Sequence, residues 1–171
     1  MAATLELLLL GTGSPIASPN RWGPSQLIIG GDTRILVDCG WGATRRLYLA
    51  RTPPQTIDAV FFTHLHSDHI TDFADFIVMR WLGGVTSPLP VYGPEGTAEM
   101  VAGFRQAVAA DTRFRFAHHG EKLSSVGTAC EVREIEAGET PVRVATVGDI
   151  EVFAFAVDHR PVMPAYGYRF E

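Results

Sequence analysis

Histidine and aspartate side chains crowd into one short stretch, FFTHLHSDHITD, at residues 61–72. His64 and His66 are separated by one residue and follow an apolar run, so extended backbone would face both imidazoles the same way. Asp68 and His69 follow at the expected start of a helix, where they can point toward the same region. Imidazole and carboxylate together suit zinc, and also manganese or iron. A set of His and Asp without cysteine is typical of a catalytic metal site rather than a closed structural one.

Each of these residues also has an ordinary interpretation. A single histidine near a helix start is usually a cap or a solvated side chain. Several histidines and an aspartate directly after a buried strand favour a metal site instead. Asp72 lies one turn into the expected helix, where we favour a surface or capping role. His118 and His119 are adjacent and therefore point in different directions, so we leave both out of the ligand set.

The elements that would position this stretch alternate between strands and helices. The run at residues 57–63 is largely apolar, which is typical of a strand covered on both faces. No repeat or linker is visible, so the sequence predicts one α/β domain over residues 1–171, with mixed strand directions. Further strands are expected at 4–10, 25–40 (a hairpin), 89–94 and 140–157 (a hairpin turning at Gly148-Asp149), and helices at 41–51, 70–84 and 95–110.

Composition narrows the classes of function. The chain has 171 residues, 46% of them hydrophobic, and a formal net charge of −5 without a block of basic residues, which disfavours nucleic acid and anionic membranes as partners. Cys39 and Cys130 are far apart and form no CxxC pair, so two reduced thiols in a cytoplasmic protein are expected. The N-terminal apolar run has no basic region before it and is too short to span a bilayer, so neither a targeting signal nor a membrane span is predicted.

The segment THLHSDH resembles the HxHxDH signature of the metallo-β-lactamase superfamily. The segments LLLLGTGSPIASPNRWGPS, LVDCG, VYGPEGT and VDHRPVMPAYGYRF resemble the branch that holds ribonuclease Z and the arylsulfatase-like hydrolases. This resemblance runs from about Leu7 to Phe170. It implies a metallo-β-lactamase-like αββα sandwich, of which the chain covers mainly the first half.

The resemblance also implies a ligand set. His64, His66 and His159 would bind a first metal, and Asp68 and His69 would bind a second. From the sequence alone, His159 is evenly balanced between a ligand and an ordinary polar residue at the end of a strand. The implied cofactor is zinc, with one or two ions in a complete site and with manganese or iron as alternatives.

These ligands imply a zinc-dependent hydrolase in which a metal-bound hydroxide attacks an ester, since a metal can lower the pKa of water from about 15.7 to about 7. Asp68 could accept the proton of the attacking water, which makes it the predicted catalytic residue. Asp38 resembles a position that hydrogen-bonds a ligand histidine, and a turn cap is the equally weighted alternative. Neither cysteine has a histidine beside it, so a thiol nucleophile has no support.

Three functions remain open at this stage. The first is hydrolysis of a small phosphodiester or sulfate ester, which NRWGPS and MRWLGG favour. The second is tRNA 3′-end processing of the ribonuclease Z type, although no Gly/Lys-rich insertion that could form an RNA-binding arm is evident. The third is a non-catalytic or partner-completed metal-binding module. Related families often form dimers, so a homodimer is expected for the complete protein.

Two ligands that the resemblance calls for do not follow His159. They are an aspartate that bridges both metals and a final histidine. Asp149, in VGDIE, precedes His159 and is interpreted as a hairpin bend. We therefore expect the chain to be part of a longer hydrolase or to need a second chain. Alone, it should expose an apolar face and an open sheet edge. It should also bind at most one metal tightly and turn over little substrate.

Overall fold

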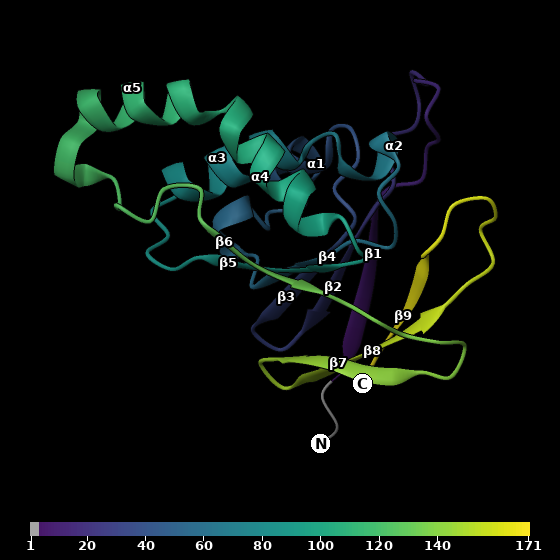
Figure 1. Cartoon of the computed structure of the whole chain (residues 1–171). Coiled ribbons are helices and arrows are strands. Elements are labelled where there is room, and N and C mark those ends of the chain that lie inside the picture. The colour runs from purple at the N-terminus through teal and green to yellow at the C-terminus, as the bar shows by residue number, and fades with distance from the viewer. Residues whose placement is uncertain (1–3) are drawn as a thin grey trace.

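The protein folds in three layers, in which two β-sheets pack face to face and helices cover the outer face of the larger sheet (Figure 1). The structure is a computed structural model that describes residues 4–171. The strands are β1 (Leu5–Gly11), β2 (Ser25–Gly30), β3 (Thr33–Val37), β4 (Ala59–Phe61), β5 (Leu89–Gly93), β6 (Cys130–Glu134), β7 (Val142–Val147), β8 (Ile150–Ala156) and β9 (Tyr166–Phe170). The helices are α1 (Ala43–Leu49), α2 (Ser67–Ile70), α3 (Phe73–Leu82), α4 (Thr97–Ala107) and α5 (Ala109–His119), with 3-10 turns at Pro54–Thr56 and Gly120–Lys122.

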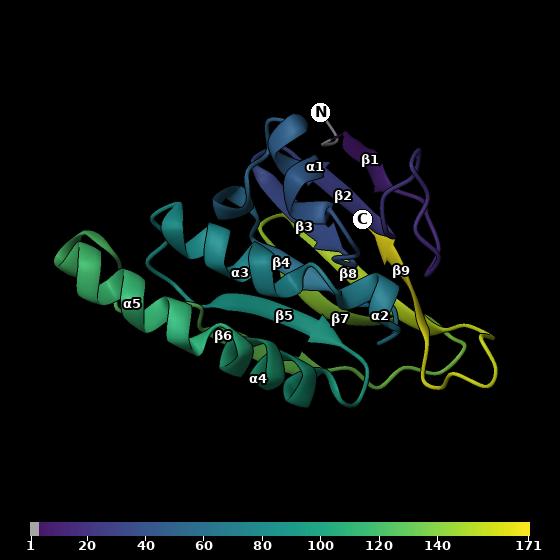
Figure 2. The same ribbon diagram turned by 90° about the horizontal axis from the view of Figure 1, so that it is seen from above.

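The larger sheet combines antiparallel and parallel pairing. Its strand order is β1-β2-β3-β4-β5-β6, and the smaller sheet has the order β7-β8-β9. The strands β1, β2 and β3 pair antiparallel, whereas β3 through β6 pair parallel. The second view shows the helices lying along the larger sheet with the smaller sheet beneath it (Figure 2). The predicted mixed α/β architecture, both predicted hairpins and the bend at Gly148-Asp149 are confirmed.

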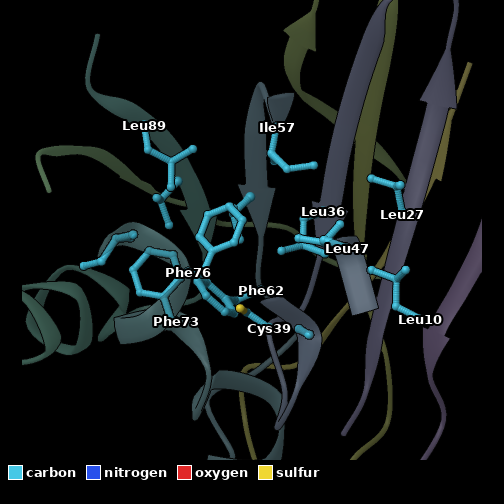
Figure 3. Packing of buried hydrophobic residues seen from close by; sticks show 14 of the residues in the cluster. Leu10, Leu27, Leu36, Cys39, Leu47, Ile57, Phe62, Phe73, Phe76 and Leu89 are labelled. Carbon is cyan, nitrogen blue, oxygen red and sulfur yellow. The ribbon is translucent and has the colours of Figure 1, made fainter. Parts of the chain in front are cut away.

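Neighbouring residues of the central strands alternate between two hydrophobic cores. Val60 and Phe62 belong to the core between sheet and helices, while Phe61 belongs to the core between the two sheets. In the same way, Leu36 packs under the helices and Ile35 faces the smaller sheet. Each fully buried side chain of this size stabilises the fold by about 1.5–3 kcal/mol. The helix-side core is drawn in Figure 3, and it fixes β4 and therefore the loop that follows β4.

The helix expected at residues 70–84 is present as α3, but Asp68 and His69, expected at the start of this helix, lie in the separate helix α2. The backbone N–H of Asp72 donates to the Cys39 carbonyl at 3.0 Å, and the Cys39 N–H donates to the His69 carbonyl at 2.7 Å. These contacts tie the break between α2 and α3 to the loop after β3. Tertiary hydrogen bonds therefore replace the local helical ones at this point, and Asp72 lies at the start of α3 rather than one turn inside a helix.

Three elements have no counterpart among the predicted ones: α5, β6 and β9. The helix α5 exposes its aromatic side chains, with Phe114 70% and Phe116 44% exposed, so it has no buried stripe for a periodicity to reveal. In the strand β6, partly buried residues alternate with exposed charged ones, namely Glu131 and Arg133. The strand β9 contains Gly167, a residue depleted in strands.

The first strand forms an open edge of the larger sheet. Among residues 4–171 it pairs with β2 alone, and Leu7 and Leu9 are 63% and 54% exposed. An apolar edge strand of this kind is a site where further chain or another molecule can pair. Within residues 4–171, none of the helices has the length and apolar character needed to cross a membrane.

Candidate metal centre

The HxHxDH segment occupies the turn between a buried strand and a short helix. All three residues of β4 are buried, and the chain then leaves the sheet through a bend at Thr63 and continues through His64 to His66. His66 stands at the N-cap position of α2, with φ −62° and ψ 145°. The following residues Asp68 and His69 lie within α2, as predicted. Strand, turn and helix start thus present four side chains at one end of the central strand.

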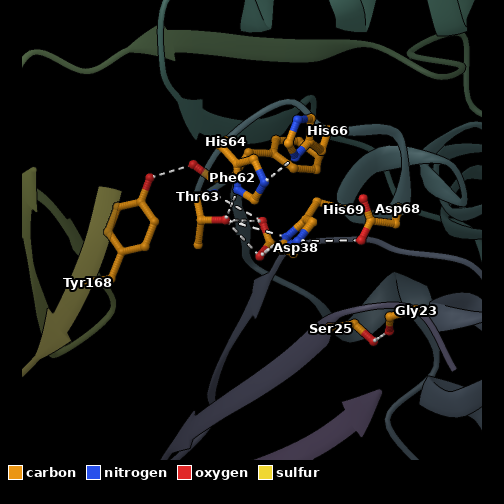
Figure 4. A network of polar contacts seen from close by, with 10 residues as sticks. All are labelled: Gly23, Ser25, Asp38, Phe62, Thr63, His64, His66, Asp68, His69 and Tyr168. Carbon is orange, nitrogen blue, oxygen red and sulfur yellow. Dashed lines mark hydrogen bonds and ion pairs between the residues drawn. The ribbon is translucent and has the colours of Figure 1, made fainter. Parts of the chain in front are cut away.

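His159 reaches this end of the sheet from the loop after β8. That loop is held in place by the smaller sheet, because the Tyr166 N–H donates to the Thr63 carbonyl at 2.9 Å. In addition, the Tyr168 hydroxyl donates to the Phe62 carbonyl at 2.7 Å (Figure 4). The last hairpin, β8-β9, therefore contacts the two residues that follow β4 and directly precede His64.

Three histidines come together at this meeting point. The potential ligand atoms of His64, His66 and His159 all lie within 4.8 Å of one another. Nε2 of His64 lies 3.1 Å from Nδ1 of His66. Two nitrogens that each bind tetrahedral zinc at 2.0–2.1 Å lie roughly 3.3 Å apart. This donor set therefore fits a divalent ion, and among residues 4–171 it is the one group of three or more such side chains found close enough together.

Thr63 connects the buried histidine to a buried carboxylate. The Thr63 hydroxyl lies 2.9 Å from Oδ2 of Asp38 and 3.0 Å from Nδ1 of His64. An ionised carboxylate only accepts, so the single hydroxyl proton goes to Asp38 and the hydroxyl oxygen accepts the Nδ1 proton of His64. This arrangement leaves the lone pair of His64 Nε2 free on the side of His66. Sequence reasoning gave Thr63 no role, although its position directly before the first histidine was a usable signal.

Asp38 also orients His69. Oδ2 of Asp38 lies 2.8 Å from Nδ1 of His69, and Oδ1 accepts the Thr63 backbone N–H at 2.9 Å. The Asp38 side chain is only 2% exposed, and its backbone has a positive φ of 59°, which Asp adopts more readily than most residues. The hydrogen bond to a histidine, one of the two roles considered for Asp38, is present in the structure. It leaves Nε2 of His69 free.

The second candidate pair lies beside the first group. Nε2 of His69 and Oδ2 of Asp68 are 3.8 Å apart, and the rings of His64 and His69 have centroids 4.1 Å apart (Figure 4). Within residues 4–171, this pair forms no separate group with a third histidine, cysteine or carboxylate. The arrangement gives one three-ligand group and one two-ligand pair next to it.

The electrostatic environment keeps His64 neutral. Its pKa is lowered to about 4, first by burial and then by the neighbouring imidazoles, of which His69 and His159 contribute most. A neutral imidazole is the form that binds metal. The side chain is therefore ready to bind a cation at neutral pH without losing a proton first.

The remaining polar residues of the segment and its surroundings lie outside this cluster. Oδ2 of Asp72 accepts the backbone N–H of Thr44 at 2.7 Å, so Asp72 caps α1 rather than its own helix, in line with the favoured capping role. His118 and His119 end α5, which lies at the opposite end of the sheet from α2 in both views (Figures 1 and 2). Cys39 and Cys130 are free thiols, and burial raises the pKa of both.

Known relatives align with almost the whole of this sequence but are longer than it. The Ribonuclease Z of Mycolicibacterium paratuberculosis is 41% identical over 170 residues, and that of Mycobacterium avium is 40% identical over 168 residues. These alignments cover 98% and 96% of this chain but only 59% and 58% of the relatives. The chain thus spans a little under three fifths of the length of the curated relatives it matches.

Solved structures show the same fold at lower identity. The human tRNase Z, short form, superimposes with a TM-score of 0.73 at 22% identity, over 96% of this chain and 64% of that one. The metallo-β-lactamase fold protein YhfI from Bacillus subtilis gives 0.69 at 21%, over 98% and 57%. The predicted metallo-β-lactamase-like fold is confirmed by these matches. A family model described as "Anti-Pycsar protein Apyc1" matches residues 5–171, and the chain therefore belongs to this family, with the metallo-β-lactamase fold and with Ribonuclease Z proteins among its relatives.

Proposed function

We propose that this chain carries the metal-binding part of a metal-dependent hydrolase that cleaves a phosphodiester bond. The observation that carries the proposal is the meeting of His64, His66 and His159 with their ligand atoms within 4.8 Å of one another. Relatives named Ribonuclease Z support an ester of phosphoric acid as the substrate. A sulfate ester has the same tetrahedral, anionic character and is kept as an alternative substrate.

Each residue of the cluster has a distinct part in this proposal. His64, His66 and His159 would hold the ion, for which zinc is the first choice. The chemistry that such an ion supplies is Lewis acidity, which activates water and polarises the ester oxygen. Thr63 and Asp38 position the two histidine rings that they contact. These partners fix the tautomer and orientation that a ligand needs.

Asp68 is the proposed general base. Its side chain lies next to the ligand group, with Oδ2 3.8 Å from Nε2 of His69. From there the carboxylate could accept the proton that water loses as it attacks the ester. The neighbouring His69 could share a second ion with Asp68, although two ligands are too few for a stable zinc site. A second tightly bound ion would need ligands from a further segment or another chain.

A partner or a longer polypeptide would complete the site. Leu7 and Leu9 leave an apolar strip on the open edge strand β1. About two fifths of each relative's length lies outside the part that matches this chain. We propose that this chain in isolation binds one ion and turns over little substrate, and that the complete protein, a cytoplasmic homodimer, supplies the missing ligands.

A second candidate function is tRNA 3′-end processing. The names of the relatives support it, and so does α5, which projects from one end of the molecule (Figure 1). This helix exposes Phe114 and Phe116 next to Arg113. Aromatic and arginine side chains on an exposed surface suit stacking and phosphate contacts with RNA. Such a helix is an element that the sequence did not lead us to expect.

The decisive experiment combines metal analysis with a substrate panel. The 171-residue chain and the protein from the full reading frame are each assayed with bis(4-nitrophenyl) phosphate, 4-nitrophenyl sulfate and a precursor tRNA. Metal-dependent release of nitrophenol from the phosphodiester supports the first function. Cleavage of the tRNA that weakens steeply with salt supports the second. Metal binding by the full-length protein without turnover of any of the three would refute both and leave a non-catalytic module.

A further inference from the structure

A recess of about 250 Å³ opens beside the proposed general base. Three segments line it: the loop between β1 and β2, the turn after β3, and α2 with the residue after it. The lining residues are Ser14, Pro15, Ala17, Arg21, Gly23, Trp41, Ser67, Asp68 and Thr71. Asp68 belongs both to this recess and to the candidate metal centre, so a molecule in the recess would lie against the carboxylate whose Oδ2 is 3.8 Å from Nε2 of His69.

The backbone holds the three segments firmly together. The Gly23 N–H donates to the Trp41 carbonyl at 2.9 Å, and the Gly40 N–H donates to the Pro24 carbonyl at 3.0 Å. A Cβ atom added to Gly40 would lie 2.2 Å from the Asp68 carbonyl oxygen, a contact that only glycine avoids. The recess is therefore built by close backbone approaches rather than by loosely placed side chains.

Trp41 lines the recess and is held in place by a second tryptophan. The rings of Trp22 and Trp41 stack with their centroids 4.7 Å apart. Gly42 makes room for this stack, because a Cβ there would lie 2.1 Å from Cε3 of Trp22. Trp41 remains 48% exposed although it is held in place. A fixed, half-exposed indole offers an apolar face to an incoming group.

Arg21 brings a positive charge to a recess that already contains the carboxylate of Asp68. Among residues 4–171, none of the ion pairs includes Arg21, in contrast to Arg115, Arg143, Arg160 and Arg169. The loop that carries Arg21 is pinned by the Gly13 N–H, which donates to the Trp22 carbonyl at 2.7 Å. A guanidinium presents paired donors that match two oxygens of a phosphate or sulfate group.

We propose that Arg21 and Trp41 form the substrate-binding side of the active site, where Arg21 contacts the anionic group of the ester and Trp41 packs against an apolar or planar substituent. This inference rests on the proposed hydrolytic function and assigns two further specificity-determining residues to it. Arg21 also offsets the negative charge of Asp68, which would otherwise repel an anionic ester at short range. The ordinary alternative is that Arg21 is a solvated surface arginine without a ligand.

The test measures binding without turnover. Metal-free protein is titrated with bis(4-nitrophenyl) phosphate and with 4-nitrophenyl sulfate, and binding is followed by calorimetry and by quenching of tryptophan fluorescence. We expect Arg21→Gln to weaken binding of the anionic esters about tenfold or more, since hydrogen bonds to a charged group are lost. Arg21→Lys should retain part of the affinity. Trp41→Leu should weaken binding and remove most of the quenching.

Matched controls separate this role from general effects of charge. Arg105→Gln removes the same charge on α4, outside the residues that line the recess, and should leave the affinity unchanged. The neutral aromatic 4-nitroanisole should bind equally to the wild type and to Arg21→Gln. If Arg21→Gln binds both esters as tightly as the wild type, or if neither ester binds the metal-free protein, the inference is wrong. The proposed function is tested separately, by turnover of the same esters with metal and the full-length protein, and failure of the binding test would not refute it.

Discussion

The carboxylate of Asp38 lies 2.8 Å from Nδ1 of His69, and the same carboxylate reaches His64 through the Thr63 hydroxyl. One buried side chain thus orients two of the histidines at the candidate metal centre. The carboxylate accepts the Thr63 backbone N–H as well, so it joins the loop after β3 to the histidine segment. Asp38 is not a member of the group of possible metal ligands, His64, His66 and His159, but it holds the residues around that group in place.

Replacing Asp38 by Asn should weaken metal binding without removing any proposed ligand. Asn keeps the shape but loses the charge and one acceptor, so His69 and Thr63 lose fixed partners. We expect zinc affinity to fall by about 10–100-fold, as is usual for residues that orient metal ligands, and the free energy of unfolding to fall by about 1–3 kcal/mol. Competition with a chromophoric chelator measures the affinity. Asp72→Asn, which affects only the cap of α1, should leave it unchanged.

The Thr63 hydroxyl should be needed for the tautomer of His64. Thr63→Val keeps the branched shape and removes the group that accepts the Nδ1 proton. We expect about tenfold weaker zinc binding, within the range for such partners. Thr63→Ser restores the hydroxyl and should restore the affinity. An equal affinity for the Val and Ser variants would show that the hydroxyl has no part in the site.

Asp68→Asn should separate catalysis from binding of the ion. The three histidines are unchanged, so zinc content should stay at the wild-type level. The proton acceptor is lost, and we expect the rate of phosphodiester cleavage by the full-length protein to fall by about a hundredfold or more. A rate close to that of the wild type would remove Asp68 from the mechanism.

The lowered pKa of His64 makes the stability of the metal-free protein depend on pH. In the unfolded chain this imidazole takes up a proton below its ordinary pKa of 6.5, whereas in the folded protein it does so only near pH 4. The unfolded state therefore binds more protons between these values, and this contribution to stability is full above pH 6.5 and is lost as the pH falls toward 4. NMR titration of the ring protons should place the His64 midpoint near 4. A midpoint near 6.5 would contradict the burial of this ring.

The sequence led to part of the site through spacing alone. His64 and His66 alternate in extended backbone, and Asp68 and His69 begin a helix, so four side chains could be directed to one point from local geometry. His159 was ambiguous, because its approach depends on β9 and on hydrogen bonds from Tyr166 and Tyr168 that no local pattern encodes. The assignment of His159 came from family resemblance, and the structure places its ring 4.6 Å from that of His64.

Other features were beyond reach of the sequence for physical reasons. The break between α2 and α3 is made by hydrogen bonds to Cys39, which is about thirty positions away in the chain. The helix α5 has no buried apolar stripe, and periodicity predicts only helices that bury one face. The recess beside Asp68 depends on three separated loops that approach closely at glycines. Contacts of this kind are set by the tertiary fold.

The zinc stoichiometry of the purified chain and its histidine variants tests the central claim most directly. After dialysis against a weak chelator, we expect about one zinc ion per chain in the wild type, as three imidazoles and one open position predict. His118→Ala, on the distant helix α5, should keep the same stoichiometry, whereas His64→Ala and His159→Ala should lose tight binding. Full metal content in both the His64→Ala and the His159→Ala variant would contradict the proposed metal centre.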